Sequence, residues 1–228
     1  QTGMKKWSIP AKTFLLGEYA AITGAPAIVL TTSPCFEITL SDKIGLHGIH
    51  PESPAGKWWL QQGQKDIGLQ WNDPYQGHGG MGASSAQFLG AYLASMHIQK
   101  KIIGPKCMLD AYLQSAWQGE GLRPSGYDVL AQSQHGCVYI DRQKDFFQNF
   151  FWPFQDIAFL LLHTGQKLAT HHHLQTMVLP SSNLHQLTAI VDIAKTAFEQ
   201  VDSHSIVEAV NAYHHQLLQM HLVAEHTM

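Results

Sequence analysis

The chain has 228 residues, of which 45% are hydrophobic and 14% are charged, a composition typical of a globular protein with a sizeable core. This composition excludes an intrinsically disordered chain and a coiled coil. Fourteen Lys and Arg residues against 17 Asp and Glu residues give a formal net charge of −3, so the chain lacks the excess of basic residues that holds nucleic acid or an anionic membrane. We therefore expect neither as a partner.

Signals for membrane insertion or export are also missing from the sequence. The longest apolar run, residues 157–162, is far shorter than the roughly 20 residues that a bilayer requires, and the N-terminus lacks the charged and then apolar order of a signal peptide. Three cysteines, Cys35, Cys107 and Cys137, have no CxxC spacing, which argues against a disulfide framework and a thiolate zinc site. We expect a cytoplasmic protein.

The first 76 residues have the pattern of a sheet. Residues 7–9, 27–32 and 36–40 are short apolar or alternating segments separated by glycine and proline, Pro34 among them, and they predict strands of an antiparallel sheet. Residues 45–76 have poor periodicity, with glycine, proline and two adjacent tryptophans interspersed. This second stretch predicts loops around a few strands.

The middle of the chain has a helical period. Apolar residues recur every three or four positions after Ser84 and again over residues 108–117, which predicts two amphipathic helices. A third, short helix is expected to begin at Ser125 or Gly126, and residues 137–140 are expected to form the strand that follows it.

The second half of the chain predicts a further α+β unit. Residues 157–162 form a continuous apolar run that favours a buried strand, and residues 184–201 and 206–217 have helical periodicity. The charged, phenylalanine-rich segment 141–154 lies between the two halves and is the best candidate for a boundary. The fold class expected from these patterns is α+β.

A glycine-rich loop precedes the first predicted helix. Residues 76–86 read QGHGGMGASSA and contain four glycines followed by Ser84 and Ser85. Glycines let the backbone approach a ligand closely, and unpaired amides at a helix N-terminus favour phosphate. The simpler alternative is a flexible turn with a serine cap. The density of glycines favours an anion site over that turn.

The same loop also matches the pattern GxGxxG through Gly77, Gly79 and Gly82. A dinucleotide site would require a hydrophobic strand before the loop and an acidic residue about 20 positions after it. The preceding residues are polar and broken by Pro74, and the next acid is Asp110. We therefore exclude a dinucleotide fold, and a Walker loop is excluded because no lysine precedes the serines.

Three segments carry motifs of a known enzyme family. They are PAKTFLLGEYAAITGAPAIVL (residues 10–30), GMGASSA (residues 80–86) and PSGYDV (residues 124–129). In this order they resemble motifs of the GHMP kinase superfamily, the small-molecule kinases named for galactokinase, homoserine kinase, mevalonate kinase and phosphomevalonate kinase. The strings GEYA and SGYDV look most similar to the mevalonate kinase and phosphomevalonate kinase branch. HTGQKLAT (residues 163–170) is more weakly similar to the family's substrate loop.

The resemblance implies a two-domain α+β fold of the GHMP kinase type. Residues 1–150 would form the ATP-binding and catalytic domain, with a mixed or antiparallel sheet and helices, and residues 151–228 would form a smaller, ferredoxin-like α+β domain. The family has a further glycine-rich motif near its C-terminus, which we do not find in residues 151–228. We therefore expect this second domain to be incomplete.

The resemblance also implies a reaction. The chain would transfer the γ-phosphoryl group of MgATP to mevalonate or a related metabolite of the mevalonate pathway, which makes isoprenoid precursors. Asp128 would accept the proton of the substrate, and Lys12 would stand beside it and stabilise negative charge. ATP and Mg²⁺ are the implied cofactors, a small molecule is the implied partner, and the resemblance leaves a homodimer open.

Further residues acquire roles only through the resemblance. The ATP phosphates would lie against the loop residues Gly79, Gly80, Met81, Gly82, Ala83, Ser84 and Ser85. The substrate would contact Glu18, Ser125, Gly126, Thr164, Lys167 and Thr170. Ser84 would hold Mg²⁺, because Ala83 replaces the family's first loop serine, and Glu120 is the nearest acidic candidate for a second ligand.

Alternatives remain at this point. Ala83 and the missing glycine-rich motif also fit a noncatalytic protein of the same fold that binds a nucleotide or metabolite, which turnover would distinguish. A kinase for homoserine or a sugar and the decarboxylating lyase of the same pathway are further candidates. The run His171, His172 and His173 does not predict a metal site, because adjacent histidines on a helix point to different faces.

Overall fold

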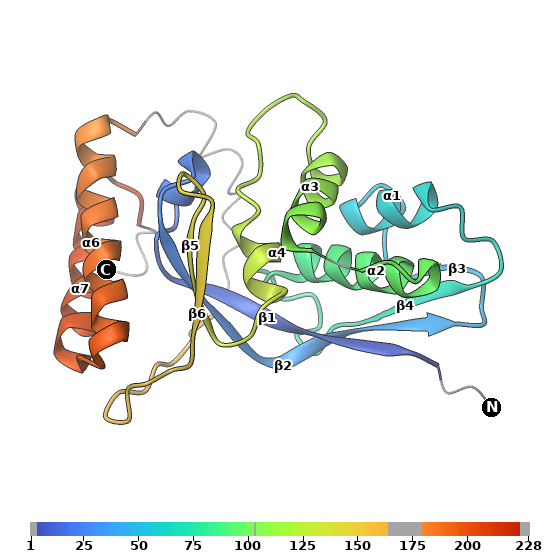
Figure 1. Ribbon diagram of the computed structural model, residues 1–228, viewed down its shortest axis with the longest axis horizontal. Coiled ribbons are helices and arrows are strands. Elements are labelled where there is room, and N and C mark those ends of the chain that lie inside the picture. Colours follow the sequence, from blue (N-terminus) through green and yellow to red (C-terminus); the bar gives the residue numbers. More distant parts are fainter. Residues whose placement is uncertain (1–3, 103, 164–178, 224–228) are drawn as a thin grey trace. The chain divides into compact units, whose positions relative to one another are not determined.

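The computed structural model describes residues 4–102, 104–163 and 179–223 (Figure 1). The chain divides into two compact units: Gln1–Thr13 with Thr31–His135, and Phe14–Leu30 with Gly136–Met228. Two long strands, β1 (Lys6–Leu16) and β2 (Ala27–Ser41), pass from one unit into the other. Each unit consists of two separate segments of the chain, and their bounds differ from residues 1–150 and 151–228. The predicted roles of residues 1–150 and 151–228 as an ATP-binding domain and a second domain stay predictions.

The first unit contains a mixed sheet. The C-terminal part of β2 pairs antiparallel with β4 (Gly68–Asn72), from Glu37 opposite Asn72 to Ser41 opposite Gly68, and β4 pairs parallel with β3 (Gly45–His47). The predicted break at Pro34 is wrong, because β2 continues through it. The pairings of β2 with β4 and with β5 use residues 37–41 and 27–30, so the missing amide of Pro34 interrupts neither of these ladders.

The described residues of the first unit form four helices. The helices predicted after Ser84, over residues 108–117 and near Gly126 are confirmed as α2 (Ala83–Gln99), α3 (Pro105–Ala116) and α4 (Tyr127–Gln132). In Figure 1, α1, α2 and α3 lie on one side of strands β2 and β4.

The helix α1 (Pro54–Gln61) was not predicted, since residues 45–76 were expected to hold loops and strands. Its start has clear local causes. Ser53 caps it by accepting a hydrogen bond from Gly56 N, and Pro54 occupies the first turn. Only Ala55, Gly56 and Trp59 are buried, so the helix is too short for a clear helical period.

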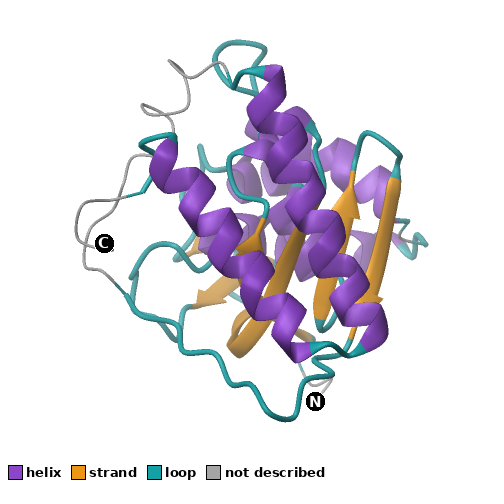
Figure 2. Ribbon diagram, turned by 90° about the vertical axis from the view of Figure 1, so that its left-hand side faces the viewer, coloured by secondary structure: helices purple, strands orange, loops and turns teal. Residues whose placement is uncertain are grey.

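The second unit packs helices against strands. The N-terminal part of β2 pairs antiparallel with β5 (Cys137–Asp141), and β5 pairs antiparallel with β6 (Phe146–Phe150). The predicted strand over residues 137–140 is thus confirmed, as are the two helices near the end, α6 (Ser181–Gln200) and α7 (Ser203–Gln219). Figure 2 shows these two long helices side by side in front of the strands.

A buried core joins the helices and strands of the second unit. Leu187 and Phe198 of α6 and Tyr213 of α7 cluster with Ile28 and Leu30 of β2. The short 3₁₀ helix η1 (Ala20–Thr23) contributes Ala20 to the same cluster. The chain is therefore an α+β protein, as expected, while the ferredoxin-like arrangement of its C-terminal part stays a prediction.

The strand predicted over residues 157–162 is wrong. These residues are not in a strand, and Leu160 and Leu162 are 81% and 75% exposed. A short apolar run forms a buried strand only when a neighbouring strand pairs with it. No described strand pairs with residues 157–162. Among the described residues, no helix is long and apolar enough to cross a membrane.

Candidate active site

The glycine-rich loop leads directly into α2. Gly82 precedes the helix in a left-handed conformation, with φ 79°, and its carbonyl accepts the hydrogen bond of Ala86 N at 3.0 Å. The amides of Ala83, Ser84 and Ser85 come before this first helical bond, as the first-turn amides of any α-helix do. With the dipole of a 17-residue helix behind them, they form a site suited to an anion.

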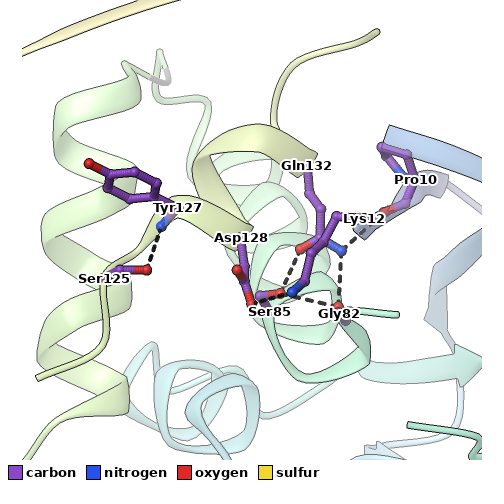
Figure 3. Close-up of polar contacts among 8 residues, drawn as sticks. All are labelled: Pro10, Lys12, Gly82, Ser85, Ser125, Tyr127, Asp128 and Gln132. Carbon is purple, nitrogen blue, oxygen red and sulfur yellow. Dashed lines mark hydrogen bonds and ion pairs between the residues drawn. The ribbon is translucent and has the colours of Figure 1, made fainter. Parts of the chain in front are cut away.

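Strand β1 brings a lysine to this loop. The amide of Lys12 donates to the carbonyl of Met81 at 3.1 Å, and the Lys12 side chain forms an ion pair with Asp128, with 3.1 Å between Nζ and Oδ2 (Figure 3). The two side chains are 13% and 33% exposed. The pair is therefore partly shielded, which strengthens its interaction, but still open to a ligand.

The short helix α4 explains the direction of Asp128. Gly126 precedes the helix with φ 75°, and Tyr127, Val129 and Leu130 are buried. Because its neighbours point into the core, Asp128 in the first turn points outward, toward Lys12. Ser125 accepts a hydrogen bond from Tyr127 N through its side chain at 3.3 Å (Figure 3), so it contributes to the start of the helix.

Two residues near this pair were not expected from the sequence. Gln132, at the end of α4, is 2% exposed and hydrogen bonds to Gly82, Ser85 and Pro10. The sequence contained an indication of Gln132, since it follows Asp128 by four residues and so lies on the same face of the helix.

Tyr112 of α3 is the second unexpected residue. Its ring packs on Phe88 of α2, with 5.2 Å between the centroids. Burial and, to a smaller extent, the negative charge of Asp128 raise the pKa of Tyr112, so its phenol is neutral at physiological pH. No sequence signal identified it, because it lies within an apolar helical pattern.

The two serines of the loop differ in their surroundings. Ser84 is exposed in the first turn of α2, whereas Ser85 is buried. The Ser85 hydroxyl lies 2.6 Å from Gln132 Oε1 and 3.1 Å from the carbonyl of Gly82. Its side chain is thus engaged within the protein, and Ser84 has the more accessible hydroxyl for a ligand.

The two predicted metal ligands, Ser84 and Glu120, come from separate segments of the first unit, and their role stays a prediction. Glu120 is exposed between α3 and α4, and its backbone carbonyl accepts a hydrogen bond from Trp117 Nε1 at 3.0 Å. Within the described residues, no group of three or more His, Cys, Asp or Glu could hold a metal ion. A bound Mg²⁺ would therefore need oxygens from the nucleotide as well as Ser84 and Glu120.

Glu18 belongs to the second unit. Its backbone carbonyl accepts a hydrogen bond from Tyr213 Oη at 2.7 Å, and its Oε2 is shielded from solvent without a hydrogen-bond partner among the described residues. Burial raises the pKa of Glu18 from 4.5 to about 7. The other predicted substrate contacts Thr164, Lys167 and Thr170, and the run His171 to His173, lie outside the described residues.

Comparisons with known proteins give a fold but no sequence relative. No protein-family model and no curated protein matches the chain. The mevalonate kinase of L. major, solved with R-mevalonate, has a TM-score of 0.66 at 20% identity, with 96% of this chain and 76% of that chain covered. The Streptococcus pneumoniae phosphomevalonate kinase, solved with phosphomevalonate and AMPPNP, has a TM-score of 0.72 at 13% identity, with 95% and 80% covered.

Homoserine kinase from Cytophaga hutchinsonii is similar as well, with a TM-score of 0.63 at 13% identity over 92% of this chain and 72% of that chain. All three are small-molecule kinases of the superfamily that the sequence motifs resemble. The chain has the GHMP kinase fold. At these identities the likeness extends to the fold alone, so the roles of single residues in this GHMP fold rest on the geometry described above.

In this GHMP fold, Gly82 has less room for a side chain than the loop glycines Gly77 and Gly80. A Cβ atom at this position would lie 2.8 Å from both Gln132 Nε2 and Lys12 Cγ, and its φ of 79° disfavours any side chain. We expect Gly82→Ala to lower the free energy of unfolding by about 1–2 kcal/mol, measured by urea denaturation. Gly63→Ala is the control: its φ is also positive, at 68°, but a Cβ there meets nothing within 4 Å. Equal losses in both variants would contradict a steric role for the crowding at Gly82.

Proposed function

We propose that the chain is an ATP-dependent small-molecule kinase that transfers the γ-phosphoryl group of MgATP to mevalonate or a related metabolite. The observation that carries this proposal is the Lys12–Asp128 ion pair beside the glycine-rich N-terminus of α2, all within the first unit. A carboxylate, a cation and a set of helix N-terminal amides are the groups that phosphoryl transfer needs. The fold likeness to three small-molecule kinases supports the same conclusion.

The loop fits the phosphates of a nucleotide. Its amides from Gly80 to Ser85 include those that precede the first hydrogen bond of α2, so they are available to phosphate oxygens. The exposed Ser84 and Glu120 would hold Mg²⁺ together with those oxygens. When bound, Mg²⁺ supplies neutralisation of charge on the phosphates.

In the proposed reaction, Asp128 acts on the substrate hydroxyl and Lys12 acts on the transferred phosphoryl group. Asp128 is partly exposed and would accept a hydrogen bond from the hydroxyl of the substrate, orient it for attack and take its proton as the new P–O bond forms. Lys12, with Nζ 3.1 Å from Oδ2 of Asp128, would stabilise the negative charge on the transferred group. Each residue then acts from the position in which the structure holds it.

The choice of substrate rests on the count of cations near the motifs. A phosphorylated acceptor requires several, and the cations in or directly beside the motif segments are only Lys12, Arg123, which precedes Pro124, and Lys167. Lys12 is paired with Asp128, and the Arg123 guanidinium lies over the ring of Trp117, 5.8 Å from its centroid. These engagements favour unphosphorylated mevalonate over phosphomevalonate.

A coupled assay of ADP release tests the proposal. The protein is incubated with MgATP and, in turn, with mevalonate, phosphomevalonate, homoserine and galactose. We expect the highest kcat/KM with mevalonate. A folded protein that binds ATP but releases no ADP with any acceptor would instead be the noncatalytic member of the fold, and a preference for homoserine or galactose would replace the substrate assignment.

A further inference from the structure

Helix α4 presents two polar side chains one turn apart. Asp128 and Gln132 are four residues apart and therefore lie on the same helix face. Both meet β1: Asp128 pairs with Lys12 Nζ at 3.1 Å, and Gln132 Nε2 donates to the carbonyl of Pro10 at 3.0 Å. The helix that carries the catalytic carboxylate is thus attached to β1 at two points, two residues apart on the strand.

The carboxamide of Gln132 is fully used. Nε2 donates to the carbonyl of Gly82 at 2.9 Å as well as to that of Pro10, and Oε1 accepts from the Ser85 hydroxyl at 2.6 Å (Figure 3). A carboxamide supplies two donor hydrogens and an acceptor oxygen from one side chain. A carboxylate of the same size would place its oxygens against two carbonyls with no hydrogen to donate. One buried group therefore joins α4, β1 and the glycine-rich loop.

The direction of the Gly82 carbonyl sets the direction of the next amide. In a trans peptide, the C=O of one residue and the N–H of the next point in opposite directions. The carbonyl of Gly82 accepts hydrogen bonds from Ala86 N of α2 at 3.0 Å and from Gln132 Nε2 at 2.9 Å, so the helix and Gln132 together fix its direction and that of the Ala83 amide. The amide of Lys12 holds the preceding carbonyl, that of Met81, in the same way, which orients the amide of Gly82.

We infer that Gln132 is a positioning residue for the phosphate site: together with the first hydrogen bond of α2, it holds the Gly82 carbonyl and so aims the Ala83 amide at the terminal phosphates of the nucleotide. This inference rests on the proposed kinase function. Gln132 touches neither nucleotide nor acceptor in this scheme and acts only through the loop. Its loss therefore weakens the binding of the nucleotide phosphates more than it slows the chemical step at saturating ATP.

Gln132→Met tests this role, since methionine has a similar length and shape but cannot make these hydrogen bonds. The probe is AMPPNP with Mg²⁺, and its Kd is measured by isothermal titration calorimetry, with adenosine as a second probe that lacks phosphates. We expect Kd for AMPPNP to rise about tenfold or more and Kd for adenosine to stay within about twofold. KM for ATP should rise in parallel while kcat changes by less than about threefold.

Two control variants separate positioning from general stability. Leu69→Ala removes a fully buried side chain of β4 in the same unit, so it lowers Tm without touching the loop, and Gln114→Met repeats the chemical change at an exposed site on α3. Both should keep the wild-type Kd for AMPPNP at a temperature well below their Tm. A Leu69→Ala variant as weak as Gln132→Met would overturn the inference, because lost stability would then explain both.

The outcomes also separate this inference from the function on which it rests. If the wild type does not bind AMPPNP, the proposed kinase function fails and the inference falls with it. If the wild type binds AMPPNP and Gln132→Met binds it equally well, the function stands and the inference is wrong. Should Gln132→Met not fold, Ser85→Ala removes only the hydroxyl on Oε1. That variant is expected to raise Kd by about threefold, and an unchanged Kd would count against the inference.

Discussion

Replacing Asp128 with asparagine is expected to lower kcat in the ADP-release assay by about 100-fold or more, equivalent to about 3 kcal/mol of lost transition-state stabilisation. Asparagine keeps the size of the side chain but can neither take the proton of the acceptor nor balance the charge of Lys12, whose Nζ lies 3.1 Å from Oδ2. Steady-state kinetics at saturating MgATP and mevalonate measure the effect.

The matched control is Asp110→Asn, because Asp110 is an exposed aspartate on α3 of the same unit. It should retain kcat within about twofold, since isolated surface charges contribute little. Asp128→Asn should still bind AMPPNP, because the loop amides do not include Asp128. An Asp128→Asn variant with the wild-type kcat would remove Asp128 from the chemistry and with it the central step of the proposed mechanism.

The parts of this site that could be predicted from sequence are those with a local cause. The glycine-rich loop before α2 and the short helix at Asp128 each depend on residues that are close together in the sequence: glycines with a positive φ and the helix that begins directly after them. The family resemblance supplied the rest, including the place of Lys12 beside Asp128. Lys12 and Asp128 are more than 100 residues apart in the sequence, so no periodicity could have predicted that they are neighbours in the fold.

The parts that could not be predicted depend on tertiary contacts. Gln132 is a polar residue in a buried stretch, and its three partners come from β1, the loop and α2. Tyr112 lies near enough for the charge of Asp128 to help raise its pKa, although its spacing in the sequence is that of any core aromatic. Residues 157–162 show the reverse case, where an apolar run predicts burial and the structure leaves Leu160 exposed.

The fold shows how little sequence identity this arrangement requires. At 13% identity to the Streptococcus pneumoniae phosphomevalonate kinase, the chain still superposes with a TM-score of 0.72. Many hydrophobic residues of suitable size can fill one core. The fold can therefore be shared where whole-chain sequence comparisons find nothing.

The second large effect is expected in stability and concerns Glu18. In the folded protein, burial raises the pKa of Glu18 from 4.5 to about 7, so the folded state binds its proton more tightly than the unfolded chain does. Stability is therefore unaffected by this group below about pH 4.5, falls as the pH rises toward 7, and is lowest above 7. A pKa difference of this size corresponds to about 3 kcal/mol.

Glu18→Gln removes this dependence, because glutamine has the same shape and no proton to lose. We expect it to raise the free energy of unfolding at pH 8 by about 2–3 kcal/mol and to change it little at pH 4.5, both measured by urea denaturation. Glu208→Gln, on the exposed side of α7, should change neither value by more than about 0.5 kcal/mol. Equal gains for Glu18→Gln at both pH values would show that Glu18 lowers the free energy of unfolding through its packing and not through its ionisation. A loss at pH 8 would mean that the charged carboxylate is paired in solution, which the lack of a hydrogen-bond partner for Oε2 among the described residues argues against.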